Sequence, residues 1–294
     1  MKRIPIYILI LLFMGGASIP AAAQSSDDHI TYLPYTTNHY VAPVHLRTGI
    51  TNIDEFLEQC PQNDPAYDQI RNTFTIRVDG TVVGDIPCSE PISAMPISQY
   101  TDELIALQVF RTLYYLNPGV TNFLPWTSQD LFGWMSGNVA GINIKSAPGQ
   151  LYCCDVIAGQ RYFSSSRQAD DQREFKRDWR GIAMSLTYFV HETRHADGGH
   201  YHVSGCLAAS GGNALACDWT YDVADLGSYG VQYWLDQAFM TGYLDVGIGC
   251  LAPERARQLA LQHESNANGN ARERYVVNPP PLVTAQPPYG GLCP

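Results

Sequence analysis

Positive charge is scarce in this chain, and charged residues of both signs are few. They make up 16% of the 294 residues, and 18 lysines and arginines stand against 28 aspartates and glutamates. The formal net charge is −10, and it would become −12 without Lys2 and Arg3. Because an acidic surface repels phosphate groups, we expect neither nucleic acids nor anionic membranes as main partners.

Long apolar runs are also scarce, and the one at the N-terminus is short. The run "IPIYILILLFMGG" follows Lys2 and Arg3 and is followed by Ala21, Ala22 and Ala23. This order predicts a signal peptide over residues 1–23 and a secreted or periplasmic mature protein. No later run reaches the roughly 18 apolar residues that cross a bilayer, so we expect no membrane span. The sequence gives no indication of the oligomeric state.

All eight cysteines follow that segment, and in an exported chain they favour disulfides over thiolate metal sites. Eight cysteines allow 105 pairings. Three pairs would each close a modest loop: Cys60–Cys88, Cys206–Cys217 and Cys250–Cys293. A ring between the neighbours Cys153 and Cys154 is strained, so we expect separate partners for them. If all three local pairs formed, Cys153 and Cys154 would be left with only each other as partners, so the two expectations conflict.

Apolar periodicity predicts an α+β fold: a small mixed sheet packed on a long helix, with a mostly helical C-terminal half. Alternation around Asp79-Gly80 indicates a hairpin over 73–86, and strands are expected within 141–166. Helices are predicted over 98–119, 125–135, 170–199, 228–240 and 252–267. The expected N-caps are Ser98 or Thr101 for the first of these helices, Thr127 for the second, and Asp170 or Asp171 for the third.

Four of the eight histidines lie within twelve residues, in "VHETRHADGGHYHVSGC" (190–206). His191 and His195 are four apart on a predicted helix, so both imidazoles point the same way and can bind one Zn²⁺. Glu192 lies one step round the helix, where it can reach a metal-activated water and serve as general base. A simpler interpretation is an exposed helix end whose histidines interact with the helix dipole.

The segment "HETRHADG" resembles the H-E-x-x-H motif of zincin metalloproteases. With Gly198 it also resembles the start of the metzincin form, in which a glycine turn brings a third histidine to the zinc. The resemblance implies a zincin-like fold with His191 and His195 as ligands and Glu192 as base. It also implies an edge strand above the zinc that binds an extended peptide, for which a strand of 141–166 is the candidate.

The chain departs from the metzincin pattern at the third ligand, where Tyr201 stands. His202 is our preferred third ligand because it leaves the chain more room to reverse, and His200 is the alternative. Other zincins take a carboxylate from a later element, so a downstream acid stays open: Asp218, Asp222 or Asp225.

Weaker signals accompany the motif. Tyr201, Tyr221 and Tyr243 are candidate oxyanion donors, and Asp197 is either a partner of a ligand histidine or part of the helix end. We expect Arg194 to face away from the metal and pair with a carboxylate. Met240 is interpreted as core packing and not as the metzincin methionine, and the isolated His263 as a surface residue.

These observations divide the chain into four parts. They are a signal peptide (1–23), an N-terminal strand and loop region (24–97), a zincin-like catalytic domain (98–277) and a proline-rich tail (278–294) tied by Cys293. The function they favour is an exported zinc peptidase acting on a protein or peptide. The alternatives are a non-catalytic zinc-binding protein and a zinc hydrolase of a non-peptide or cell-wall substrate.

Overall fold

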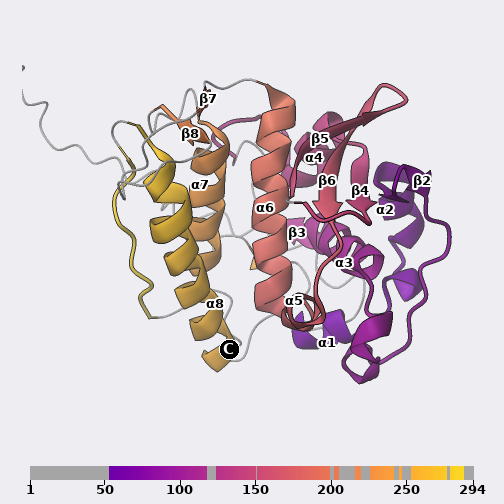
Figure 1. Cartoon of the computed structure of the whole chain (residues 1–294). Helices are drawn as coiled ribbons and strands as arrows, with labels where there is room; N and C mark the ends of the chain where they lie inside the picture. The colour runs from indigo at the N-terminus through magenta and orange to yellow at the C-terminus, as the bar shows by residue number, and fades with distance from the viewer. Residues whose placement is uncertain are drawn as a thin grey trace, which may run out of the picture. The chain divides into compact units, whose positions relative to one another are not determined.

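A mixed sheet of five strands packs against helices in the computed structural model of the chain (Figure 1). The structure describes residues 53–117, 124–149, 151–198, 202–204, 216–219, 226–241, 245–246, 253–276 and 279–287. All of them belong to one unit, His39–Pro294. The predicted signal peptide and residues 24–52 lie outside the described residues. In the described ranges, no helix is long and apolar enough to cross a bilayer.

The sheet has the strand order β2-β1-β4-β6-β5. Its strands are β1 (Thr75–Val78), β2 (Thr81–Val82), β4 (Gly141–Lys145), β5 (Tyr152–Ile157) and β6 (Gln160–Ser166). Strand β4 runs parallel to β1 and to β6, whereas β5 runs antiparallel to β6 and forms one edge. The predicted small mixed sheet is therefore confirmed.

Two tight turns explain the antiparallel pairs. Asp79 and Gly80 have φ angles of 46° and 83°, and Ala158 and Gly159 have φ angles of 51° and 79°. Positive φ at both central residues matches the right-handed twist of the flanking strands. The first turn joins β1 to β2, so the hairpin predicted around Asp79-Gly80 is confirmed.

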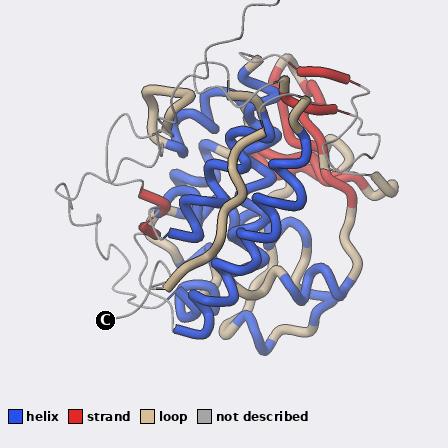
Figure 2. The backbone as a smooth tube through the Cα atoms, turned by 90° about the vertical axis from the view of Figure 1, so that its left-hand side faces the viewer, coloured by secondary structure: helices blue, strands red, loops and turns tan. Residues whose placement is uncertain are grey.

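The helices are α1 (Ile53–Glu58), α2 (Tyr67–Thr73), α3 (Asp102–Tyr115), α4 (Leu131–Asn138), α5 (Asp170–Phe175), α6 (Trp179–Asp197), α7 (Ser228–Thr241) and α8 (Pro253–Asn266). Two short ladders pair β3 (Leu116–Asn117) with β9 (Asp245–Val246), and β7 (His202–Ser204) with β8 (Ala216–Asp218). Helix α6 stands between the sheet and the α7–α8 pair (Figure 1). Turned by 90°, the helices lie in front and most of the strands gather at the upper right, with short strand pieces at the left (Figure 2). The C-terminal half is mostly helical, as predicted.

Side chains cap α3 and α4, whereas α5 follows Ala169 without a side-chain cap, so the prediction of Asp170 or Asp171 as a cap was wrong. The hydroxyl of Thr101 accepts the Leu104 amide 3.3 Å away, so α3 begins at one of the two expected caps. For α4 the prediction of Thr127 was wrong, because Asp130 accepts the Gly133 amide at 2.6 Å. Thr127 instead accepts the amide of Gln129 and closes a turn before the helix. A carboxylate near a helix start also interacts favourably with the dipole, which favours Asp130.

The long helix predicted over 170–199 is two helices. Asp178 caps α6 by accepting the Gly181 amide at 3.2 Å, which ends α5 after Phe175. A Cβ on Gly181 would lie 2.3 Å from the Phe175 carbonyl oxygen. The close approach of the two backbones therefore requires glycine, and the chain turns sharply between α5 and α6.

The core lies between the sheet and the helices α3 and α6. The ring of Phe189 on α6 contacts Phe110 of α3 and Phe163 of β6, with centroids 5.6 Å and 4.8 Å apart. Farther along α3, Arg111 is 0% exposed, and its Nε is 2.6 Å from the Asp64 carboxylate. This ion pair connects α3 to the segment after α1. Arg111 also donates to the Phe56 carbonyl and so connects α3 to α1 itself.

The α1 and α2 helices lie where we expected strands and loops, and a disulfide holds the region. Cys60 and Cys88 are bonded, as predicted. Neither helix reaches eight residues, so each carries too few turns for apolar periodicity to stand out.

Helices α7 and α8 share a buried polar contact. His263 is 0% exposed, and its Nδ1 lies 2.6 Å from the Asp236 carboxylate, which also accepts from Asn266. The prediction that His263 is a surface residue was wrong. It follows Leu259 and Ala260 at helical spacing on the face that packs on α7, and Asp236 satisfies its ring nitrogen.

Candidate metal centre

The last turns of α6 bring two histidines together. The Nε2 atoms of His191 and His195 are 3.2 Å apart. Two nitrogens bound to one tetrahedral zinc ion at about 2.0–2.1 Å lie about 3.3 Å apart. The distance between these two nitrogens therefore matches two ligand positions of one zinc ion. His191 is 7% exposed and His195 is partly exposed.

Helix α7 fixes the ring of His191. Its Nδ1 lies 2.9 Å from Gln232 Oε1. When Nδ1 carries the proton and donates to this oxygen, the lone pair on Nε2 can bind a metal. The ring of Tyr229 meets His191 edge-on, with centroids 4.6 Å apart. A ligand histidine with its other nitrogen held by an oxygen is the usual arrangement around protein-bound zinc.

Glu192 points to the edge strand of the sheet. Its carboxylate accepts the backbone amide of Cys153 on β5 at 2.7 Å. Burial raises the pKa of Glu192 to about 7, and the Cys153 hydrogen bond offsets part of that effect. The carboxylate therefore lies between the helix that carries the histidines and the strand at the open edge of the sheet.

Cys153 and Cys154 are bonded to each other, so our expectation of separate partners was wrong. The pairing of β5 with β6 shifts register between Cys153 and Asp155. Cys217 is also disulfide-bonded, and the other cysteines proposed for local pairs lie outside the described residues.

The structure leaves the third ligand open. The side chain of His202 is not described, and His200, Asp222 and Asp225 lie outside the described residues. Asp218 is buried, and its carboxylate accepts the Gly230 amide at 2.9 Å. Among the described side chains, no cluster of three or more His, Cys, Asp or Glu that could hold a metal is found.

Other sequence-derived expectations about the helix end have clear outcomes. Gly198 has φ 71° and ends α6 in the left-handed conformation, as the glycine turn requires. Arg194 pairs with the carboxylate of Asp197, which also accepts from Trp134. Met240 is buried in α7, as core packing predicts. The candidate oxyanion donors Tyr201, Tyr221 and Tyr243 lie outside the described residues.

Sequence reasoning missed Gln232, Tyr229 and the role of Cys153. The first two lie on α7, about forty residues after His191, and a local motif carries no information about such a distant element. The chain matches no known protein family, no curated protein and no solved structure in our comparisons.

Proposed function

We propose that the chain is an exported zinc-dependent peptidase of the zincin type. The observation that carries the proposal is the convergence of the His191 and His195 nitrogens, 3.2 Å apart, beside a glutamate that faces an edge strand. The α+β arrangement, with an antiparallel strand at the sheet edge next to the motif helix, agrees with the zincin resemblance.

The roles of the chain's own residues follow from their positions. His191 and His195 would hold the zinc ion, and Gln232 would fix the proton of His191 on Nδ1. A bound zinc ion supplies Lewis acidity toward water and the substrate carbonyl. Glu192 takes the proton from the attacking water and then delivers it to the leaving amine.

The substrate class is inferred from β5. In the described part of the chain, β5 pairs on one side only, with β6. An extended peptide can add to an open strand edge through main-chain hydrogen bonds. Because Glu192 contacts this same strand, a peptide bound along β5 would present a backbone carbonyl to the base and the histidines.

We propose His202 as the third ligand. It lies on β7, where its backbone pairs with Asp218 of β8. Asp218 in turn accepts the amide of Gly230, next to Tyr229, which contacts His191. This sequence of contacts brings the β7 backbone to the same end of α7 as His191. Substitution of His202 should therefore weaken zinc binding more than substitution of His200.

The decisive experiment is Glu192→Gln in the zinc-loaded protein. We expect peptide hydrolysis to fall by about 10²- to 10⁴-fold, the usual contribution of a general base, while one zinc per chain is retained. Hydrolysis is followed with a quenched fluorescent peptide library, and zinc with elemental analysis. The matched control is Glu254→Gln, which removes an exposed carboxylate on α8 and should leave both readouts unchanged.

Two outcomes would contradict the proposal. If Glu192→Gln hydrolyses peptides as fast as the parent protein, the assigned mechanism is wrong. If the parent protein binds zinc, loses stability with a chelator and hydrolyses no peptide, the non-catalytic zinc protein becomes the better interpretation.

A further inference from the structure

A cavity is lined by residues of α6 and by the segment that precedes β5. Its inner part, about 130 Å³, is lined by Tyr188 and Phe189 of α6 and by Leu151, two residues before Cys153. Tyr188 precedes Glu192 by one helical turn, which is about 5.4 Å along the axis. The cavity therefore begins one turn away from the proposed base.

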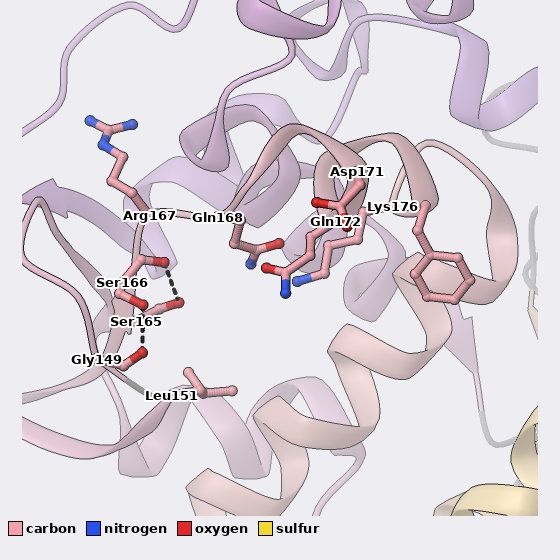
Figure 3. Close-up of a pocket in the computed structure, with 10 residues that line it drawn as sticks. Gly149, Leu151, Ser165, Ser166, Arg167, Gln168, Asp171, Gln172 and Lys176 are labelled. Atoms are coloured by element: carbon pink, nitrogen blue, oxygen red, sulfur yellow. Dashed lines mark hydrogen bonds between the residues drawn. The ribbon is translucent and has the colours of Figure 1, made fainter.

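Lys176 marks the boundary between this inner part and an outer mouth of about 490 Å³. Ser165 and Gln168 also line both parts. Figure 3 shows the Lys176 ammonium directed into the outer mouth beside the amide groups of Gln168 and Gln172. We call the two parts together the Lys176 pocket.

Two acids line this pocket together with Lys176: Asp102 in the inner part and Asp171 in the outer mouth. Asp102 is the acid whose charge raises the pKa of Lys176. Its carboxylate pairs with Arg173 at 3.2 Å and with Arg167 at 3.7 Å. Glu103 is held by Arg167 at 2.7 Å. Asp171 lies exposed at the mouth.

The Lys176 ammonium is left without an ion pair or hydrogen bond to any described residue. Burial outweighs the attraction of Asp102 and lowers the pKa of Lys176 to about 8, so the group is mostly charged at neutral pH. A partly buried charge without a partner is costly, and an incoming anion would relieve that cost.

The orientation of β5 says which part of a substrate reaches the pocket. A peptide that pairs antiparallel with β5 runs from Ile157 toward Tyr152, so its C-terminal part approaches Gly149 and Leu151 at the pocket. A volume near 130 Å³ corresponds to about four water molecules at about 30 Å³ each, which is room for a group of the size of a carboxylate.

We propose that the Lys176 pocket binds a carboxylate that lies on the C-terminal side of the scissile bond, with Lys176 as its ionic partner. The inference rests on the peptidase function proposed above and adds its substrate class. The carboxylate is either an acidic side chain or the C-terminus of the peptide. A charge-assisted bond to a carboxylate, compared with the neutral amide, corresponds to about 10- to 100-fold in affinity.

Lysine content makes a direct test possible. The chain has three lysines, Lys2, Lys145 and Lys176, and the first lies in the predicted signal peptide. Lysine labelled with ¹³C at Cε should therefore give two signals in the mature protein, assigned with Lys176→Met. Three blocked peptides are added to the zinc-loaded Glu192→Gln protein: glutamate with an amidated C-terminus, glutamine with an amidated C-terminus, and glutamine with a free C-terminus.

We expect the glutamate peptide or the free-acid peptide to shift the Lys176 signal and raise its pKa, and the neutral peptide to do neither. Which of the two charged peptides acts identifies the source of the carboxylate. In the parent enzyme, kcat/KM for the preferred peptide should exceed that for the neutral one by about tenfold or more. Lys176→Met should remove this preference, whereas Arg257→Met, a charge-matched change on exposed α8, should keep it.

The outcomes separate this inference from the peptidase proposal. If no peptide is hydrolysed but Lys176 responds to a carboxylate, the peptidase function fails and the pocket assignment stands. If Lys176 responds equally to the neutral and charged peptides, or to none, the pocket assignment is overturned even when the protein is an active peptidase.

Discussion

Replacing Lys176 with methionine should stabilise the protein near neutral pH. The ordinary pKa of 10.5 falls to about 8 in the fold because the ammonium loses hydration. A difference of about 2.5 pKa units corresponds to about 3 kcal/mol between the charged and neutral forms. Because the side chain keeps part of its surface exposed, we expect Lys176→Met to raise the free energy of unfolding by about 1–3 kcal/mol at pH 7.

The pH dependence of this gain has a fixed sign. Between pH 8 and pH 10.5 the unfolded chain binds more protons at Lys176 than the folded chain, so this group makes the parent protein more stable as pH rises. The advantage of Lys176→Met should therefore shrink over that interval. Urea unfolding of both proteins at pH 7 and pH 10 measures the difference. Equal stability at pH 7, or an advantage that does not shrink, would refute the reasoning about the buried charge.

Three other predictions test separate parts of the structure. Asp64→Asn should lower the free energy of unfolding in urea by about 3–5 kcal/mol, because it leaves a buried arginine without its counter-charge; a loss under 1 kcal/mol would mean that the arginine finds another partner. Gln232→Leu should weaken zinc binding by about 10- to 100-fold in a competition assay, since His191 loses the oxygen that orients it; unchanged affinity would remove Gln232 from the site. Gly198→Ala should cost about 1–2 kcal/mol in urea unfolding because φ is 71° there, whereas Gly137→Ala inside α4 should not destabilise; equal effects would contradict the left-handed helix end.

Local patterns predicted those parts of the fold that depend on neighbouring residues. The Asp79-Gly80 turn, the Thr101 cap and the Gly198 helix end depend on a few adjacent positions, and each prediction was confirmed. The break before α6 was missed because it depends on Gly181, whose backbone packs against another turn of the chain.

The candidate site divides in the same way. The spacing of His191 and His195 is a property of one helix, so the sequence predicts that their nitrogens converge. The contacts of Gln232 and Cys153 with this pair and its glutamate join three elements, α6, α7 and β5, and only the packing of those elements reveals them. The surface position predicted for His263 failed for the same reason, since Asp236 on a neighbouring helix accommodates its ring.

Helix α6 carries the proposed chemistry and also lines part of the Lys176 pocket. On α6, Phe189 and Tyr188 line the pocket, and Glu192 and His195 follow within the next two turns. An α-helix is stiff over this length, so α6 fixes the distance between the proposed catalytic residues and the part of the pocket that it lines. Insertions in the surrounding loops would leave this spacing unchanged. New specificity would have to arise by exchanging the side chains that line the pocket, Lys176 among them, one position at a time.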